Sequence, residues 1–136
     1  MKIEYRQAVK EDAELLIGIY NAAFYSDYLK YGECPGYGKT KGMMEESIIG
    51  YPKFIILCDN EAVGCLCVVP KHQGRGIGAQ AIGFIKEHYL DWKRITLVTP
   101  VDKSENVKFY TEKCGFKIVS TEKSGNVELA RFVIER

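Results

Sequence analysis

Two kinds of hydrophobic pattern alternate along the chain. Alternating apolar and polar residues, or short apolar runs bounded by turn residues, predict β-strands at 2–7, 54–58, 62–69, 94–99, 117–121 and 127–135. Apolar residues at helical spacing predict helices at 11–24, 41–49, 76–89 and 104–114. This order of elements favours a mixed α/β fold in which helices cover both faces of a sheet.

Turn residues separate these elements. Residues 59–60 are predicted to form a turn after the second strand, Gly115 to end the last helix, and residues 124–126 to connect a C-terminal hairpin. The tract 25–40, rich in tyrosine and glycine, is predicted to be a loop or a broken helix. Because no repeat or linker interrupts the pattern, residues 1–136 are expected to form one domain.

A glycine-rich segment carries the clearest functional signal. After the apolar stretch 65–69 and a loop begun by Pro70, glycines occupy the alternate positions Gly74, Gly76 and Gly78 at the start of a predicted helix. Glycine has no Cβ, so an anionic group can approach the backbone closely. A helix N-terminus adds unpaired N–H groups and the positive end of the helix dipole. The segment therefore predicts a site for a phosphate or a pyrophosphate.

The spacing of this segment disfavours a dinucleotide site. Gly74, Gly76 and Ala79 fit the pattern G-x-G-x-x-A, but that motif opens its helix directly after a strand, and residues 70–73 intervene here. The motif also requires an acidic residue at the end of the next strand, whereas this strand ends in Thr99.

A second glycine-containing segment fails the test for a nucleotide-binding P-loop. Residues 36–40 end like a P-loop, but Glu33 stands where the motif requires glycine, and Pro35 lies inside the loop. No apolar strand precedes the segment, so the P-loop is rejected.

Two motifs together resemble a known family. The segment Gln73-Gly74-Arg75-Gly76-Ile77-Gly78 resembles the acetyl-CoA signature of the GNAT N-acetyltransferase superfamily, Q/R-x-x-G-x-G/A. Residues 106–116 resemble the second signature of that family, a helix that ends in a run containing Tyr, Lys, Gly and Phe in this order. The resemblance is specific from Cys65 to Phe116. It implies a mixed, mostly antiparallel central sheet with helices on both faces and a splayed pair of strands at the CoA site.

The resemblance also implies the chemistry of the site. Acetyl-CoA would be the co-substrate, and a primary amine of a small molecule would attack its thioester directly, without an acyl-enzyme. Backbone N–H groups of the glycine segment would hold the pyrophosphate, and backbone groups of the preceding strand would face the pantetheine and the thioester. The residues expected to bind the cofactor are Cys67, Val68, Gln73, Gly74, Arg75, Gly76, Ile77, Gly78, Ala79 and Asn106.

Tyr110 is the expected catalytic residue. The resemblance places its hydroxyl near the CoA sulfur, where it would protonate the departing thiolate as a general acid. The alternative is a packing role, which the adjacent Phe109 also fills. Asn106 lies four residues earlier, so on a helix both side chains would share one face; a plain surface asparagine is the alternative. No general base is evident, and the candidates on the acceptor side are Asp27, Glu33, Glu45 and Glu46.

For three segments the sequence leaves both a functional and a structural interpretation open. The alternate glycines either bind phosphate or only form a tight turn between strand and helix. Lys71 and His72 are either solvated loop residues or neighbours of the adenosine phosphate. The tract 25–37, which holds four tyrosines, is either a lid over the acceptor or a structural loop that covers the core.

Composition limits the partners and the location. Lys and Arg number 19 against 18 Asp and Glu, so no net charge attracts nucleic acid or an anionic membrane. No apolar run approaches the roughly 20 residues of a membrane span, and residues 1–4 are too polar for a signal peptide. A cytoplasmic location is therefore expected. The five cysteines form no C-x-x-C pair and the two histidines lie far from any ligand cluster, so we expect reduced packing thiols and no metal.

One stretch departs from the family pattern, which has an antiparallel hairpin before the phosphate loop. Here residues 61–64 run straight into residues 65–69, and even the tightest hairpin uses about two loop residues between separate strands. Our hypothesis is that residues are missing between Val63 and Cys65, either as an omitted loop or as a true deletion. An intact mass equal to the 15.4 kDa of this sequence would exclude the omission.

Two other functional classes remain alternatives. A non-catalytic acyl-CoA sensor would keep residues 73–78 and bind CoA without turnover. An interaction protein would use the tyrosine-rich tract to bind a partner and would be recovered in a stable complex without CoA. The exposed edge of the terminal hairpin is a candidate for pairing two subunits as a homodimer.

Overall fold

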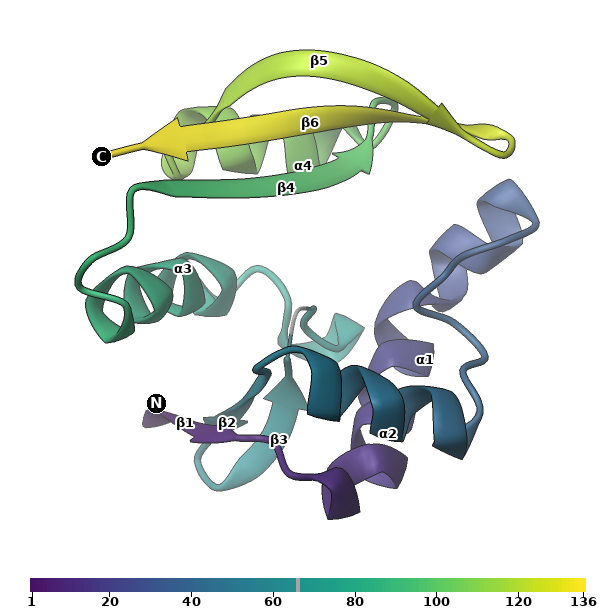
Figure 1. The fold of residues 1–136 in the computed structure, drawn as a ribbon, viewed down its shortest axis with the longest axis vertical. Coiled ribbons are helices and arrows are strands. Elements are labelled where there is room, and N and C mark those ends of the chain that lie inside the picture. The colour runs from purple at the N-terminus through teal and green to yellow at the C-terminus, as the bar shows by residue number, and fades with distance from the viewer. Residues whose placement is uncertain (66) are drawn as a thin grey trace. The chain divides into compact units, whose positions relative to one another are not determined.

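The protein combines antiparallel sheets with helices, as Figure 1 shows. The computed structural model describes residues 1–65 and 67–136. These residues group into two compact units, 1–78 and 79–136. The mixed, mostly antiparallel α/β class predicted from the sequence is confirmed, and its hydrogen-bonded strands form one three-stranded sheet in each unit. The two strands expected to splay apart at the CoA site belong to different units, so their arrangement stays a prediction.

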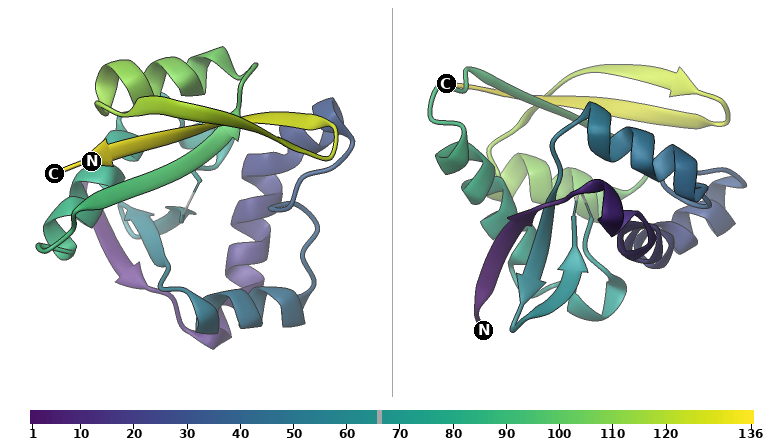
Figure 2. Two further views of the ribbon diagram at one scale, coloured as in Figure 1. Left: turned by 45° about the horizontal axis from the view of Figure 1, so that its top comes forward. Right: turned by 60° about the horizontal axis from the view of Figure 1, so that its bottom comes forward.

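The sheet of the first unit has the order β1-β2-β3 and is antiparallel throughout. Its strands are β1 (Ile3–Gln7), β2 (Phe54–Cys58) and β3 (Glu61–Gly64), seen side by side in the right panel of Figure 2. Asp59 and Asn60 form the predicted turn with φ of 49° and 70°. Two positive φ values are what a tight hairpin turn needs, and Asn and Asp tolerate them better than most residues.

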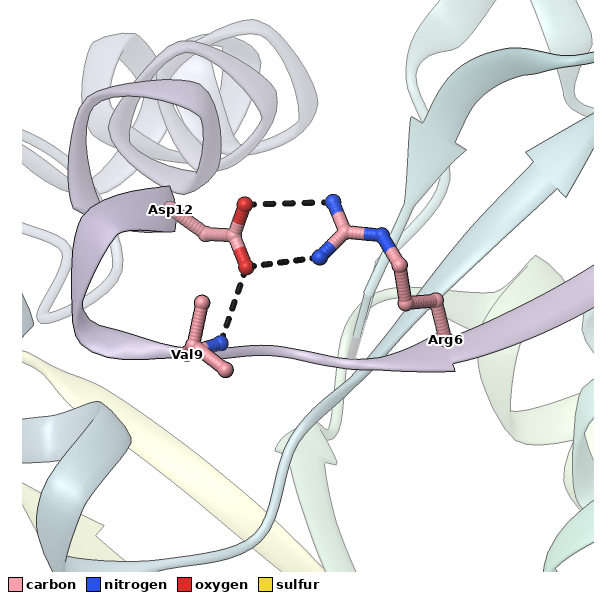
Figure 3. Close-up of polar contacts among 3 residues, drawn as sticks. All are labelled: Arg6, Val9 and Asp12. Atoms are coloured by element: carbon pink, nitrogen blue, oxygen red, sulfur yellow. Dashed lines mark hydrogen bonds and ion pairs between the residues drawn. The ribbon is translucent and has the colours of Figure 1, made fainter.

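Asp12 anchors the entrance to the first long helix (Figure 3). Its carboxylate accepts two hydrogen bonds from the Arg6 guanidinium, at 2.9 and 3.1 Å, and one from the backbone N–H of Val9 at 2.8 Å. The hydrogen bond from Arg6 is the main reason that the pKa of Asp12 lies below its ordinary value. The short 3₁₀ turn η1 (Lys10–Asp12) then leads into α1 (Ala13–Tyr31).

Helix α1 is longer than the sequence pattern indicates. The predicted helix stops at residue 24, but α1 continues through Tyr25 and Tyr28 to Tyr31 and ends at Gly32, whose φ is 76°. The sequence predicts a loop or a broken helix over residues 25–40, but residues 25–31 instead continue α1 without a break, and residues 32–40 form the loop. Tyr37, from the following segment, stacks on Tyr28 at 4.5 Å, so tertiary packing supports this part of the helix.

Helix α2 (Lys41–Gly50) starts where the sequence predicts, with the Thr40 hydroxyl accepting a hydrogen bond from the Met43 N–H at 3.2 Å. Residues of both helices share one core with Ile55 of β2. The core of this unit is apolar apart from the hydroxyl of Tyr20 and consists of Ala8, Ala13, Leu16, Ile19, Tyr20, Met44, Ile48, Ile55 and Cys65.

The extended strand predicted over 62–69 is wrong, because the chain reverses within it. Strand β3 ends at Gly64, which pairs with Val68 in an antiparallel bridge, and the Val69 N–H donates to the Val63 carbonyl at 2.9 Å. A Cβ at position 64 would lie 2.3 Å from the Cys67 carbonyl oxygen, so the reversal requires glycine. Leu66, which the prediction included, lies outside the described residues.

The reversal changes the argument for missing residues. Gly64 already pairs with Val68, so the chain turns back without an added loop. The geometry therefore gives no reason to expect an omitted loop. The hypothesis that residues are missing between Val63 and Cys65 still has to be tested by the intact mass.

The sheet of the second unit has the order β4-β6-β5 and is also antiparallel. Its strands are β4 (Arg94–Pro100), β5 (Lys117–Ser124) and β6 (Val127–Glu135), and β5 and β6 form the predicted C-terminal hairpin. Phe116, Ala130 and Phe132 are the centre of its core, against which Ile82 of α3 (Ile77–His88) and Val107 of α4 (Ser104–Lys108) pack.

The predicted last helix is present, but its second half is wider than an α-helix. Residues Phe109–Lys113 (η3) form a π-turn in which the Cys114 N–H donates to the Phe109 carbonyl at 3.1 Å. Gly115, with φ of 79°, ends the helix as predicted. Within the described residues, we find no helix with both the length and the apolar character needed to cross a bilayer.

Candidate functional site

The glycine segment adopts the backbone conformation that its sequence suggests. Gly74 and Gly76 both have φ of 79°, in the left-handed region that other residues rarely adopt. An added Cβ would meet no atom within 4 Å at either glycine, so the backbone angle, not crowding, requires glycine there. Gly78 lies inside α3, whose first residue, Ile77, is buried.

Gln73 ties this segment to the strand-like residues before it. Its side-chain Nε2 donates to the Val68 carbonyl oxygen at 2.9 Å. The 3₁₀ turn η2 (Pro70–His72) lies between them, and the Gln73 N–H donates to the Pro70 carbonyl at 3.2 Å. Gln73 therefore holds the loop closed, and the Val68 carbonyl is already occupied. Sequence spacing gave no sign of either contact.

Cys67 lies next to a small buried polar group. Burial raises the pKa of its thiol to about 12, so the thiol is protonated near neutral pH. Its carbonyl oxygen accepts a hydrogen bond from the Cys65 N–H at 2.8 Å. Nearby, the buried Lys53 ammonium donates to the Tyr20 hydroxyl at 3.4 Å, and burial raises the pKa of Tyr20. The sequence analysis did not single out Lys53, because a lysine before a strand normally faces solvent.

Tyr110 and Asn106 lie in the second unit. The Tyr110 ring packs against Phe116 and Phe132, with ring centroids 5.9 and 5.5 Å away, and burial raises the pKa of its hydroxyl. The Asn106 amide donates to the Thr99 hydroxyl oxygen at 3.2 Å and thereby ties α4 to the end of β4. Both residues therefore have structural contacts, and their roles toward a ligand stay predictions.

The tyrosine-rich tract folds back on α1. Tyr37 stacks on Tyr28 and lies 5.9 Å from the Tyr25 ring, and the Gly38 N–H donates to the Asn21 side chain at 2.9 Å. Tyr25 and Tyr28 are exposed on this surface. Among the candidate bases, Asp27 is buried in α1, whereas Glu33 and Glu46 are exposed.

The part of the chain that the structure describes contains no group of three His, Cys, Asp or Glu side chains placed to hold a metal ion. The five cysteines, all within that part, are free thiols.

One family model matches more than half of this chain. The family described as "Acetyltransferase (GNAT) domain" matches residues 42–118, more than half of the chain. The uncharacterized protein YrkN of Bacillus subtilis (strain 168) is 40% identical over 52 residues. That match covers 38% of this chain and only 28% of YrkN.

Solved structures share the fold over nearly the whole chain. One is an acetyltransferase from Salmonella typhimurium that modifies the N-terminal serine of ribosomal protein L7/L12, with a TM-score of 0.77, 14% identity, and coverage of 100% of this chain and 96% of that chain. Another is the aminoglycoside acetyltransferase AAC(6')-Ib in complex with coenzyme A, with a TM-score of 0.73, 15% identity, and coverage of 99% and 95%. At such low identity, the likeness shows the fold alone.

Proposed function

This chain belongs to the GNAT acetyltransferase family, and from that premise we propose that it is an acyltransferase that transfers the acetyl group of acetyl-CoA to a primary amine of a small molecule. The observation that carries the proposal is the pair of left-handed glycines, Gly74 and Gly76, directly before α3. Left-handed glycines directly before a helix are typical of backbone loops that offer N–H groups to an anion, and a helix N-terminus favours binding of a pyrophosphate. A loop that served only as a connection would not need two such angles.

The proposed CoA site extends on both sides of these glycines. Backbone N–H groups of residues 74–79 hold the pyrophosphate, and the Arg75 guanidinium adds a charge-assisted contact. Backbone groups of Cys67 and Val68 face the thioester, and Asn106 faces the pantetheine arm. The N–H groups of Cys67 and Val68, not their carbonyl oxygens, are the proposed contacts, because both carbonyl oxygens accept hydrogen bonds within the chain.

The proposed reaction is a direct transfer. The amine nitrogen attacks the thioester carbonyl, the C–N bond forms, the C–S bond breaks, and the CoA thiolate leaves. The nitrogen loses a proton to a carboxylate on the acceptor side or to water, and the thiolate gains one, so the products are the acetylated amine and CoA thiol. Tyr110 acts as the general acid toward that thiolate. Because burial raises the pKa of Tyr110, its hydroxyl is protonated throughout the neutral range and donates a hydrogen bond to the developing charge. The raised pKa of the Cys67 thiol argues against an acyl-enzyme at that residue.

The acceptor is proposed to be a small amine. The two structural relatives acetylate either a protein N-terminus or an aminoglycoside, so the fold accommodates both kinds of acceptor. The exposed tyrosines of the tract 25–37 support the smaller acceptor, because an amphipathic ring surface contacts a small amine on several sides.

A thiol-release assay tests the transfer. Purified protein is incubated with acetyl-CoA and a panel of amines that includes aminoglycosides, polyamines and peptides with a free N-terminal serine, and free CoA is measured. Release that depends on a small amine supports the proposal. Release only with the peptides would reassign the acceptor, and CoA binding without any release would favour the sensor.

One observation keeps the sensor as a second candidate. Strand β3 has only four residues, and the chain reverses at once after Gly64, beside the residues proposed to face the thioester. A shortened strand at that point offers fewer backbone groups to orient an acyl group. The sensor would bind CoA at the same loop and would release no thiol.

A further inference from the structure

His72 connects three charged side chains beside the glycine loop. Its Nδ1 lies 2.8 Å from Nη1 of Arg75, and its Nε2 lies 3.5 Å from Oε2 of Glu61. The other carboxylate oxygen of Glu61 lies 3.2 Å from Nζ of Lys71. The four side chains thus form a continuous polar chain from the start of β3 to the residue between the two left-handed glycines.

The donors and acceptors in this chain define the tautomer of His72. A guanidinium carries only donors, so Nδ1 must accept the hydrogen bond from Arg75 and holds no proton. In a neutral imidazole the proton then resides on Nε2, the nitrogen that faces the Glu61 carboxylate. Glu61 suits this role because the hydrogen bond and charge of Lys71, with a smaller contribution from His72, hold its pKa below the ordinary value.

Burial distinguishes His72 from its partners. Its side chain is 12% exposed, against 71% for Lys71 and 56% for Glu61. Nε2 is buried and makes no hydrogen bond to the described residues, so its 3.5 Å contact with Glu61 is an electrostatic one. Arg75, in contrast, is an exposed residue between two glycines, whose backbone does nothing to restrict its side chain. The imidazole is therefore the fixed member of the pair, and it limits the rotamers that the guanidinium would otherwise sample.

We propose that His72, held by Glu61, is a positioning residue that orients the Arg75 guanidinium toward a phosphate group of bound CoA. The inference rests on the proposed function, because it takes CoA as the ligand of this loop. One Nη1–H of Arg75 is used by His72, and the remaining donors keep the forked geometry that matches phosphate oxygens. A guanidinium that is already oriented loses less side-chain freedom when the ligand binds.

Calorimetric titration of CoA into three forms of the protein tests the role of His72. His72→Leu removes both ring nitrogens and should weaken the Kd of CoA by about 3- to 10-fold, the cost of ordering one long side chain on binding. His72→Gln keeps an acceptor for Arg75 and a donor for Glu61, so its Kd should stay close to that of the wild type. His88→Leu, at the other histidine of the chain, is the matched control and should leave the Kd unchanged.

A double-variant cycle separates positioning from general loop damage. If His72 acts through Arg75, His72→Leu should add nothing once Arg75→Met is present. The inference would be overturned if His72→Leu changed the Kd of CoA by less than two-fold, or if His72→Leu and His72→Gln weakened it equally. The proposed function would stand in both cases. Failure of the wild type to bind CoA would instead overturn the proposed function.

Nitrogen-15 NMR of the histidine rings gives a test that needs no ligand and no variant. For a neutral imidazole, the contact of Nδ1 with the Arg75 guanidinium requires the Nε2–H tautomer of His72 in the free protein. A spectrum dominated by the Nδ1–H tautomer would overturn the inference, because that nitrogen could not then accept from Arg75.

Discussion

At the scale of single residues, Tyr110 is the side chain whose chemical and packing roles can be separated most cleanly. Its ring packs among Phe109, Phe116 and Phe132, so phenylalanine fits the same space and removes only the hydroxyl. Tyr110→Phe should therefore leave the Tm nearly unchanged and lower kcat by about 10-fold or more, toward the range typical of a lost general acid. Steady-state kinetics measures the effect, with the exposed Tyr89 changed to Phe as the control.

An unchanged kcat in a folded Tyr110→Phe protein would remove this hydroxyl from the mechanism. The ring would then have the packing role that the sequence analysis kept as the alternative. A substitution of Asn106 would separate a ligand role from a structural role less cleanly. The Asn106 amide donates to the Thr99 hydroxyl, so removing the amide would also disturb the helix.

At the scale of elements, the glycine loop and its helix give a matched pair of substitutions. Gly76→Ala forces a Cβ onto a backbone with φ of 79° and should cost roughly 1–2 kcal/mol of stability and weaken CoA binding. Gly83→Ala, inside α3 with open space around it, should instead stabilise the helix by about 0.5–1 kcal/mol. Urea unfolding measures both. Equal effects of the two substitutions would mean that the left-handed conformation is absent in solution.

The start of α1 gives a prediction that depends on pH. Asp12→Asn should lower the unfolding free energy near pH 7 by about 0.5–1 kcal/mol, as expected for a partly exposed ion pair. The folded-state pKa of Asp12 is depressed, so its stabilisation is present above the unfolded pKa and is lost as pH falls through the folded one. The difference between variant and wild type should therefore shrink in acid.

Denaturation curves at neutral and acidic pH measure this change. Glu14→Gln is the control, because its contact with Lys41 spans 3.8 Å between highly exposed side chains. A difference between Asp12→Asn and wild type that stays constant with pH would contradict the ion-pair account.

Local patterns predicted most elements but not their long-range contacts. The turn at residues 59–60, the end of the last helix at Gly115 and the C-terminal hairpin depend on residues adjacent in sequence, and all three are confirmed. The end of α1 depends on Tyr37 stacking from a later segment, and the reversal after Gly64 interrupts an apolar run that resembles one strand. Likewise, the glycine spacing located the loop, but no periodicity indicates that His72 contacts Arg75.

At the scale of the whole molecule, the length of the chain is itself testable. Family membership rests on residues 42–118, and the chain aligns with only 28% of the length of YrkN. An intact mass of 15.4 kDa, measured by electrospray mass spectrometry of the purified protein, would exclude a loop omitted between Val63 and Cys65. A larger mass, with additional residues mapped by peptide sequencing between Val63 and Cys65, would restore the family hairpin.

Assembly and location stay predictions. Strand β5 is exposed along its whole length at one edge of the β4-β6-β5 sheet, so it is the edge expected to pair two subunits. The single-domain organisation and the cytoplasmic location likewise rest on the sequence alone.

The central claim, that the glycine loop binds acetyl-CoA, is tested most directly by a thermal-shift titration with acetyl-CoA, CoA and NAD in parallel. A ligand at 100 times its Kd stabilises the folded state by about 2.7 kcal/mol, which raises the Tm of a domain of this size by several degrees. We expect this rise with acetyl-CoA and with CoA, and none with NAD. A Tm that rises with none of the three ligands, or with NAD alone, would contradict the claim.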